Sequence, residues 1–164
     1  MLQMETVLDV WETKLINNKK IITMANFSNY LENQIVNWLD GVTMPAAPTI
    51  LHVALFSSET TDAGGGTEIT TNITGAATRA AVANAAWTVT AASTTLDAKI
   101  QNNAEITITN SSTNSTNVNA THFGVFTAAT GGELLFHGQL ASIVEITPGS
   151  AIKFAPNSIT LTVQ

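Results

Sequence analysis

Three histidines are the residues in this chain whose type could support metal binding or acid–base catalysis. His52, His122 and His137 all lie in apolar stretches with β-strand character. A neutral imidazole is a common metal ligand, and His122 and His137 fall on the two arms of one expected hairpin. Only Glu133 among the acidic residues is close to that hairpin in sequence. Because histidines in apolar strands usually hydrogen-bond within or beside the core, we expect all three to be structural, with no metal and no cofactor.

Carboxylates and hydroxyls offer a second kind of chemistry. A glycosidase pair would have to be drawn from acids whose spacing selects no pair, namely Asp97, Glu105, Glu133 and Glu145. Serines are frequent, but none lies in a Gly-x-Ser-x-Gly elbow. The glycine-rich segment 62–68 has oxygen ligands for calcium but lacks the alternating acids of an EF-hand loop. We therefore predict no catalytic, metal-binding or cofactor-binding residues, and a protein that is not an enzyme.

Arg79 is the only arginine of the chain, and small residues surround it. One interpretation is that it pairs with an aspartate or glutamate on a neighbouring strand or reaches a neighbouring subunit. The alternative is an exposed side chain that contributes little to stability.

The composition excludes several classes of protein. Only 11% of the 164 residues are charged, 45% are hydrophobic, and the net charge is −6. A nucleic-acid-binding protein needs a basic surface to displace counterions, and an anionic membrane attracts basic segments. Basic residues are too few here for either interaction, so we expect no nucleic-acid partner and no membrane insertion. Because the chain has no cysteine, disulfides and thiolate chemistry are excluded as well.

The chain divides into a short N-terminal segment and one domain. Residues 1–23 predict either an extension upstream of a second natural start at Met24 or a peripheral arm, and 24–164 predict the domain. Within it, residues 26–40 predict a helix capped by Asn26 or Ser28 and ended by Gly41. Its apolar stripe is expected to pack on a sheet, and helix pairing in an oligomer is the alternative.

After Pro48 the apolar period changes from helical to alternating. Strands are predicted at 50–56, 67–70, 78–84, 87–90, around Ile100, and at 105–109, 143–146, 151–154 and 158–163, with a hairpin over 121–140. Segments 57–66 and 110–119 predict the longest polar loops. Nine or ten short strands with one N-terminal helix indicate a mainly β protein: an antiparallel β-sandwich or jelly-roll-like barrel.

Several segments of the domain resemble those of a known group of proteins. The matching segments are 25–33, 51–56, 60–64, 121–126, 134–138, 151–155 and 159–163. In their order and spacing the chain resembles small structural proteins of tailed-bacteriophage virions, which include tail-fibre-like, minor tail and decoration proteins. It departs from their pattern at Ala77–Arg79, where a tyrosine often stands before an arginine pair, and at Asn117–Asn119, where Trp-Gly is frequent.

The resemblance implies assembly and no catalytic motif. It predicts a virion structural protein, associated with the tail or its fibres or decorating the capsid, whose partners are other virion proteins and copies of itself. The alternative is an adhesin module at a fibre tip that binds a host receptor or glycan. Exposed aromatic residues on long loops would favour that alternative, but 57–66 and 110–119 contain none.

Overall fold

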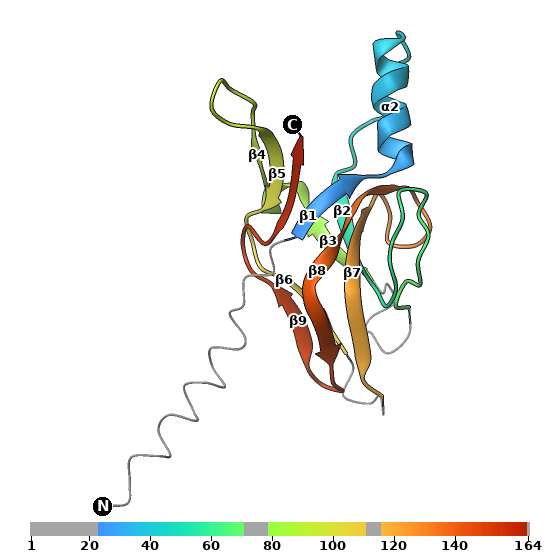
Figure 1. Ribbon diagram of the computed structural model, residues 1–164, viewed down its shortest axis with the longest axis vertical. Coiled ribbons are helices and arrows are strands. Elements are labelled where there is room, and N and C mark those ends of the chain that lie inside the picture. Colours follow the sequence, from blue (N-terminus) through green and yellow to red (C-terminus); the bar gives the residue numbers. More distant parts are fainter. Residues whose placement is uncertain (1–22, 71–78, 111–115, 164) are drawn as a thin grey trace, which may run out of the picture.

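The computed structural model describes residues 23–70, 79–110 and 116–163, so the arm predicted over residues 1–23 lies outside the described residues except for Thr23. The described residues contain one α-helix, a short 3-10 helix and ten strands (Figure 1). The elements are β1 Thr23–Phe27, α2 Asn29–Leu39, β2 Ile50–Phe56, β3 Ala80–Ala83, η2 Asn84–Ala86, β4 Trp87–Thr90, β5 Ala98–Asn102, β6 Ile106–Thr109, β7 Val118–Phe126, β8 Leu134–Ile146, β9 Ala151–Phe154 and β10 Ile159–Val163. The predicted mainly β class is confirmed.

Eight of the strands form one sheet that nearly closes on itself. Their order is β3-β2-β7-β8-β1-β10-β5-β4, and every pair is antiparallel except β1 with β10. The two edge strands, β3 and β4, are joined only by the three residues of η2. Such a short connection requires the two edges to approach each other, which bends the sheet into an open barrel.

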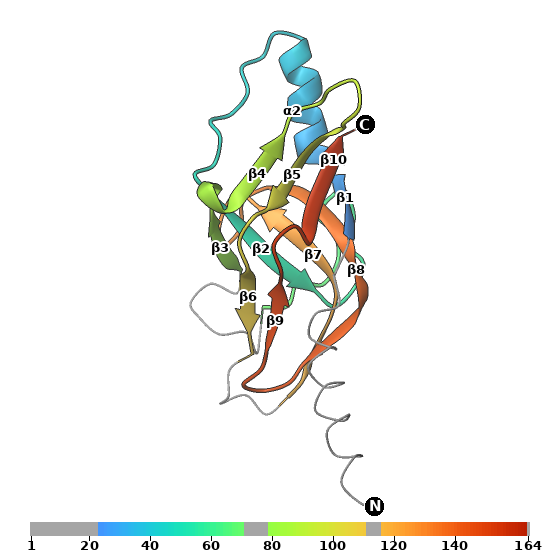
Figure 2. The ribbon, with the colours of Figure 1, turned by 90° about the vertical axis from the view of Figure 1, so that its left-hand side faces the viewer.

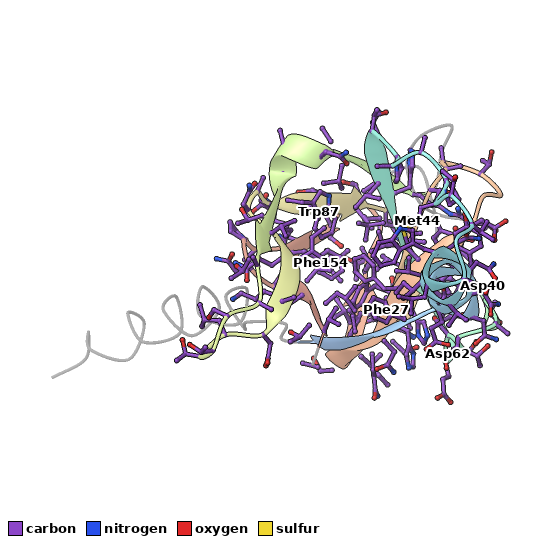
Figure 3. The ribbon with its side chains drawn as sticks, turned by 90° about the horizontal axis from the view of Figure 1, so that it is seen from above. Phe27, Asp40, Met44, Asp62, Trp87 and Phe154 are labelled. Carbon is purple, nitrogen blue, oxygen red and sulfur yellow. The ribbon has the colours of Figure 1, made fainter. Side chains whose placement is uncertain are left out.

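The remaining strands, β6 and β9, pair with each other and form a second, two-stranded sheet. They lie across from β2, β7 and β8, as the two side views show (Figure 2). An aromatic contact joins the two sheets, since Phe123 of β7 lies 6.4 Å from Phe154 of β9. Within the large sheet, Trp87 of β4 meets Phe136 of β8 edge-on at 6.2 Å. Seen from above, Trp87 and Phe154 lie within the ring of strands (Figure 3).

Alternation along the strands determines which side chains enter this core. In β6, Ile106 and Ile108 are buried and Thr107 is exposed, as the period of two predicts. The strand β2 is instead buried on both faces over its last four residues. Its Val53 and Leu55 face the main core, whereas Ala54 and Phe56 belong to a second apolar cluster with Phe126 and Leu134. This explains why the sequence of β2 is continuously apolar.

Three local predictions differ from the structure. The stretch Thr23–Phe27 forms strand β1, because β8 and β10 pair with its two sides, and the helix begins only at Asn29. The segment 67–70 forms only an isolated bridge between Glu68 and Phe56. The strands expected at the end of the hairpin and at 143–146 are one continuous strand, β8, because no turn residue separates them.

Candidate functional site

The three histidines lie on different strands and have different surroundings. His52 is on β2, His122 on β7 and His137 on β8. The register places His137 opposite Gly124 and His122 opposite Gln139, so the two are only diagonal neighbours. The Nδ1 atom of His122 lies 2.9 Å from the hydroxyl of Thr121. Within the described ranges, no three histidine, cysteine or acidic side chains lie close enough to hold a metal ion.

His137 connects the hairpin to the long loop 57–66. Its Nε2 lies 2.9 Å from Oδ1 of Asp62, a residue 75 positions earlier in the chain. The imidazole is buried, whereas the carboxylate is about half exposed. The backbone carbonyl of Asp62 also accepts a 2.8 Å hydrogen bond from the amide of Asn29, the first residue of α2. His137 therefore secures the point where strand β8, the loop and the start of the helix meet.

Replacing His137 with alanine is expected to lower the free energy of unfolding by about 1–3 kcal/mol, because a buried side chain and its charge-assisted hydrogen bond to Asp62 are lost. His122→Ala is the matched control, because the Nδ1 of His122 contacts the hydroxyl of the adjacent Thr121 and not a residue far along the chain. Urea unfolding of the two variants measures both effects. Equal losses would show that the contact with Asp62 contributes nothing.

Arg79 is held by an arrangement that its neighbours in sequence do not reveal. It is only 8% exposed, so the expectation of a solvent-exposed arginine is wrong and the expectation of an ion pair is confirmed. Its Nε and Nη2 donate to the two carboxylate oxygens of Glu68 at 2.7 and 2.8 Å. Its Nη1 donates to the carbonyls of Ala128 (2.9 Å) and Gly131 (2.7 Å) in the β7–β8 turn.

The guanidinium also covers an aromatic ring, because its central carbon lies 3.6 Å from the ring centre of Phe126. That ring stacks on Phe56 at 6.2 Å. Glycine is needed in the turn that Arg79 binds, since Gly131 and Gly132 adopt φ angles of 60° and 67°. Arg79 thus fastens the glycine-rich loop and the hairpin turn over the second apolar cluster.

Four of the carboxylates considered for catalysis or calcium binding have separate partners. Glu105 accepts a 2.9 Å hydrogen bond from Lys153, which lowers the pKa of this exposed carboxyl below its usual value. Glu145 accepts a hydrogen bond from Asn117. In the segment 62–68, Asp62 already hydrogen-bonds to His137, and Glu68 forms an ion pair with Arg79.

The fold alters the titration of His52. Burial lowers its pKa below the usual 6.5, and the positive charge of Arg79 lowers it further. The unfolded chain then binds a proton that the folded chain resists. The stability contribution of neutral His52 is therefore complete above pH 6.5 and decreases as the pH falls toward the lowered pKa.

This shift predicts a pH dependence that one substitution removes. Between pH 7 and pH 5, the wild-type chain should lose more of its free energy of unfolding than His52→Gln does. Urea titrations at several pH values give the difference between the two proteins. A difference that stays constant across this range would contradict the assignment.

The helix α2 departs most clearly from the sequence interpretation. Its predicted N-cap is confirmed: the hydroxyl of Ser28 accepts from the amide of Leu31 at 3.2 Å, and the same hydroxyl donates to the carbonyl of Leu134. Its stripe packs on the sheet only over the first half of the helix, however, and no residue of the helix is fully buried. The helix projects from one end of the barrel (Figures 1 and 2).

Only the first half of α2 is partly covered by the protein body. Its half-buried residues are Tyr30, Leu31, Gln34 and Ile35, and the helix contacts β8 and β1. From Val36 onward the helix and the following loop are exposed, and a hollow of about 400 Å³ is lined by Trp38, Gly41, Val42, Thr43 and Met44. One feature of the sequence could have indicated this exposed apolar region, namely the near absence of charge around it. Asp40 is the only charged residue in 33–58.

A second hollow, of about 270 Å³, lies where the helix begins. Tyr30, Asp62, Gly64, Phe126 and Glu133 are among the residues that line it. It combines two aromatic rings with two carboxylates, and it is the place where the loop 57–66 and the hairpin turn come together.

Comparison with known proteins adds a family to this geometry. Residues 26–162 match the family model described as podophage GP4 fiber I protein gp80. No curated protein matches the chain. The described residues contain no helix that is both long and apolar enough to cross a membrane.

Proposed function

Because the chain belongs to the podophage GP4 fiber I protein gp80 family, we propose that it is a fibre subunit that works by packing against other virion proteins and against copies of itself, without catalysing a reaction. A fibre protein of a podophage is a virion component, and so is this chain. The family description favours the tail apparatus over capsid decoration, the two locations that the sequence left open.

The observation that carries this proposal is the exposed apolar end formed by α2 and the loop after it. A monomeric protein rarely exposes a large contiguous apolar patch, and such patches commonly mark contacts with other proteins. The side chains best suited to chemistry, Arg79 and His137, are instead used within the fold, where each holds a carboxylate of the loop region. Both features agree with a protein that acts through its surfaces.

Immunogold labelling of intact particles tests this function. We expect gold at the tail, and labelling with antibody pre-absorbed on the purified protein is the control. Label spread over the capsid shell would overturn the fibre assignment, and mass spectrometry that finds no peptide of this chain in purified particles would overturn the virion role itself.

The hollow beside Tyr30 favours binding of a glycan as a second candidate function. Its carboxylates, Asp62 and Glu133, can accept hydrogen bonds from sugar hydroxyls, and the ring of Tyr30 offers an apolar face for a pyranose. Tyr30 lies on α2, and so supplies the aromatic that the loops 57–66 and 110–119 lack. Saturable binding on a glycan array that Tyr30→Ala and Glu133→Gln both abolish would support this function, and the absence of saturable binding would exclude it for the glycans tested.

A further inference from the structure

The large apolar side chains that are exposed gather at one end of the molecule. Six of them form what we call the α2 surface: Val36, Trp38, Leu39, Val42, Met44 and Ile50. Three more lie on β4, on the β4–β5 loop and at the end of β10, namely Val89, Leu96 and Val163. The helix, the tip of the β4–β5 hairpin and the end of β10 project in the same direction (Figures 1 and 2). Among the described residues, only Ile143 of β8 is a comparably exposed large hydrophobic elsewhere.

The size of this end is that of a protein interface. The six side chains of the α2 surface are between 40% and 73% exposed. Those on one side of the helix supply part of the roughly 800 Å² that one partner contributes to a stable complex. The exposed residues of the β4–β5 hairpin and of β10 can supply the rest of this area.

The charge of the α2 surface identifies the kind of partner. The whole chain carries −6, yet Asp40 is the only charged residue between positions 33 and 58. An acidic or basic partner would gain little from such a surface. A second copy of the chain brings an equally uncharged apolar surface, so the two meet with almost no repulsion between like charges, and the acidic remainder of each copy stays in water.

The backbone of this region lowers the cost of association. The loop after α2 contains Pro45 and Pro48, which restrict its conformations before binding. Gly41 ends the helix with φ of 89°, and Ser28 and Asn29 hold its start against the loop and the hairpin. A surface that is already ordered loses less conformational entropy when it is buried.

We propose that the α2 surface is the contact between two copies of this chain. The proposal rests on the proposed function as a fibre subunit, because a fibre is built from repeated copies, and it specifies the surface through which those copies meet. Other occupants, such as residues 1–22 of the same chain or a different virion protein, would leave the purified chain monomeric, so the oligomeric state distinguishes them.

Size-exclusion chromatography with light scattering on the full chain at about 100 µM, well above a micromolar dissociation constant, tests the proposal. The wild type should have at least twice the mass of the 17.3 kDa chain. Val36→Lys/Leu39→Lys should reduce the mass to that of one chain, because two charges would be buried without partners. The matched control is Ile143→Lys, since Ile143 is 70% exposed and Leu39 73% exposed, and it should keep the wild-type mass.

Circular dichroism melting checks that the variants remain folded, as expected for substitutions at exposed sites. A monomeric wild type, or a Val36→Lys/Leu39→Lys variant that keeps the oligomeric mass, would overturn the proposal. These measurements use the purified chain, so they are independent of the tests on phage particles. A monomeric chain that still labels the tail would refute only this interface. Absence of the chain from the particle would refute the proposed function.

Discussion

Replacing Arg79 with methionine is expected to lower the free energy of unfolding by about 3–5 kcal/mol, the usual loss when one partner of a buried ion pair is removed. Methionine preserves much of the apolar volume over Phe126 but cannot donate hydrogen bonds. The carboxylate of Glu68, whose side chain is only 20% exposed, would lose its counter-ion. The carbonyls of Ala128 and Gly131 would lose the donor that joins them to the glycine-rich loop.

The control for this prediction is the other lysine- or arginine-based ion pair of the described residues. Lys153 and Glu105 are 60% and 49% exposed, and Lys153→Met should have little effect on the free energy of unfolding, because water screens an exposed pair. Urea unfolding of both variants measures the contrast. If Arg79→Met cost as little as Lys153→Met, the burial and geometry of Arg79 would have no energetic consequence.

A double variant separates the ion pair from the packing around it. If the loss comes mainly from the stranded carboxylate, Arg79→Met combined with Glu68→Leu should recover part of it, because two apolar side chains can replace a buried pair at little cost. If the loss comes from the freed turn carbonyls, the double variant should remain as unstable as the single one.

Replacing Asn102 with leucine is expected to lower the free energy of unfolding by about 3 kcal/mol or more, because three backbone groups would lose their partner at about 1 kcal/mol or more each. Asn102 is fully buried at the end of β5. Its Nδ2 donates to the carbonyls of Ala104 and Ala155, and its Oδ1 accepts from the amide of Ile159, all at 2.8 Å. Leucine has a similar size but satisfies none of these groups.

The neighbouring residue provides the control. Asn103 is exposed and donates to the carbonyl of Ala85 and the hydroxyl of Thr88, so Asn103→Leu should cost less than about 1 kcal/mol because water can replace those bonds. Asn102→Asp adds a finer test, since it retains an acceptor for Ile159 but turns a carboxylate toward two carbonyls. Equal midpoints for the two leucine variants would contradict the assigned role of Asn102.

Much of the strand pattern could be predicted because it is local. The bounds of β2, β4 and β9 follow from short apolar or alternating runs between turn residues, and the structure reproduces them. The cap at Ser28 and the left-handed Gly41 are likewise properties of a few adjacent residues. The matched segments that resembled tailed-phage virion proteins also lie in order along the chain, and the family match confirms them.

Other features depend on residues that are far apart in sequence. The strand β1 has little alternation of its own and exists because β8 and β10 pair with its two edges. The partners of Arg79 in the hairpin turn lie 49 and 52 positions away, and the partner of His137 lies 75 positions away. No local pattern encodes such pairings, since they arise only when the sheet closes.

The three histidines could in principle bind a metal or act in acid–base catalysis. Their positions in apolar strands already favoured structural roles. The sequence by itself determined the β class, most strand positions and the kinship with virion proteins, because periodicity, turn residues and segment order are local properties of the chain. Only the tertiary structure decided that His137 and Arg79 hold loops and that the second half of the apolar stripe of α2 remains uncovered. Burial depends on what else the fold brings to a face, and here the sheet supports only the first half of the helix.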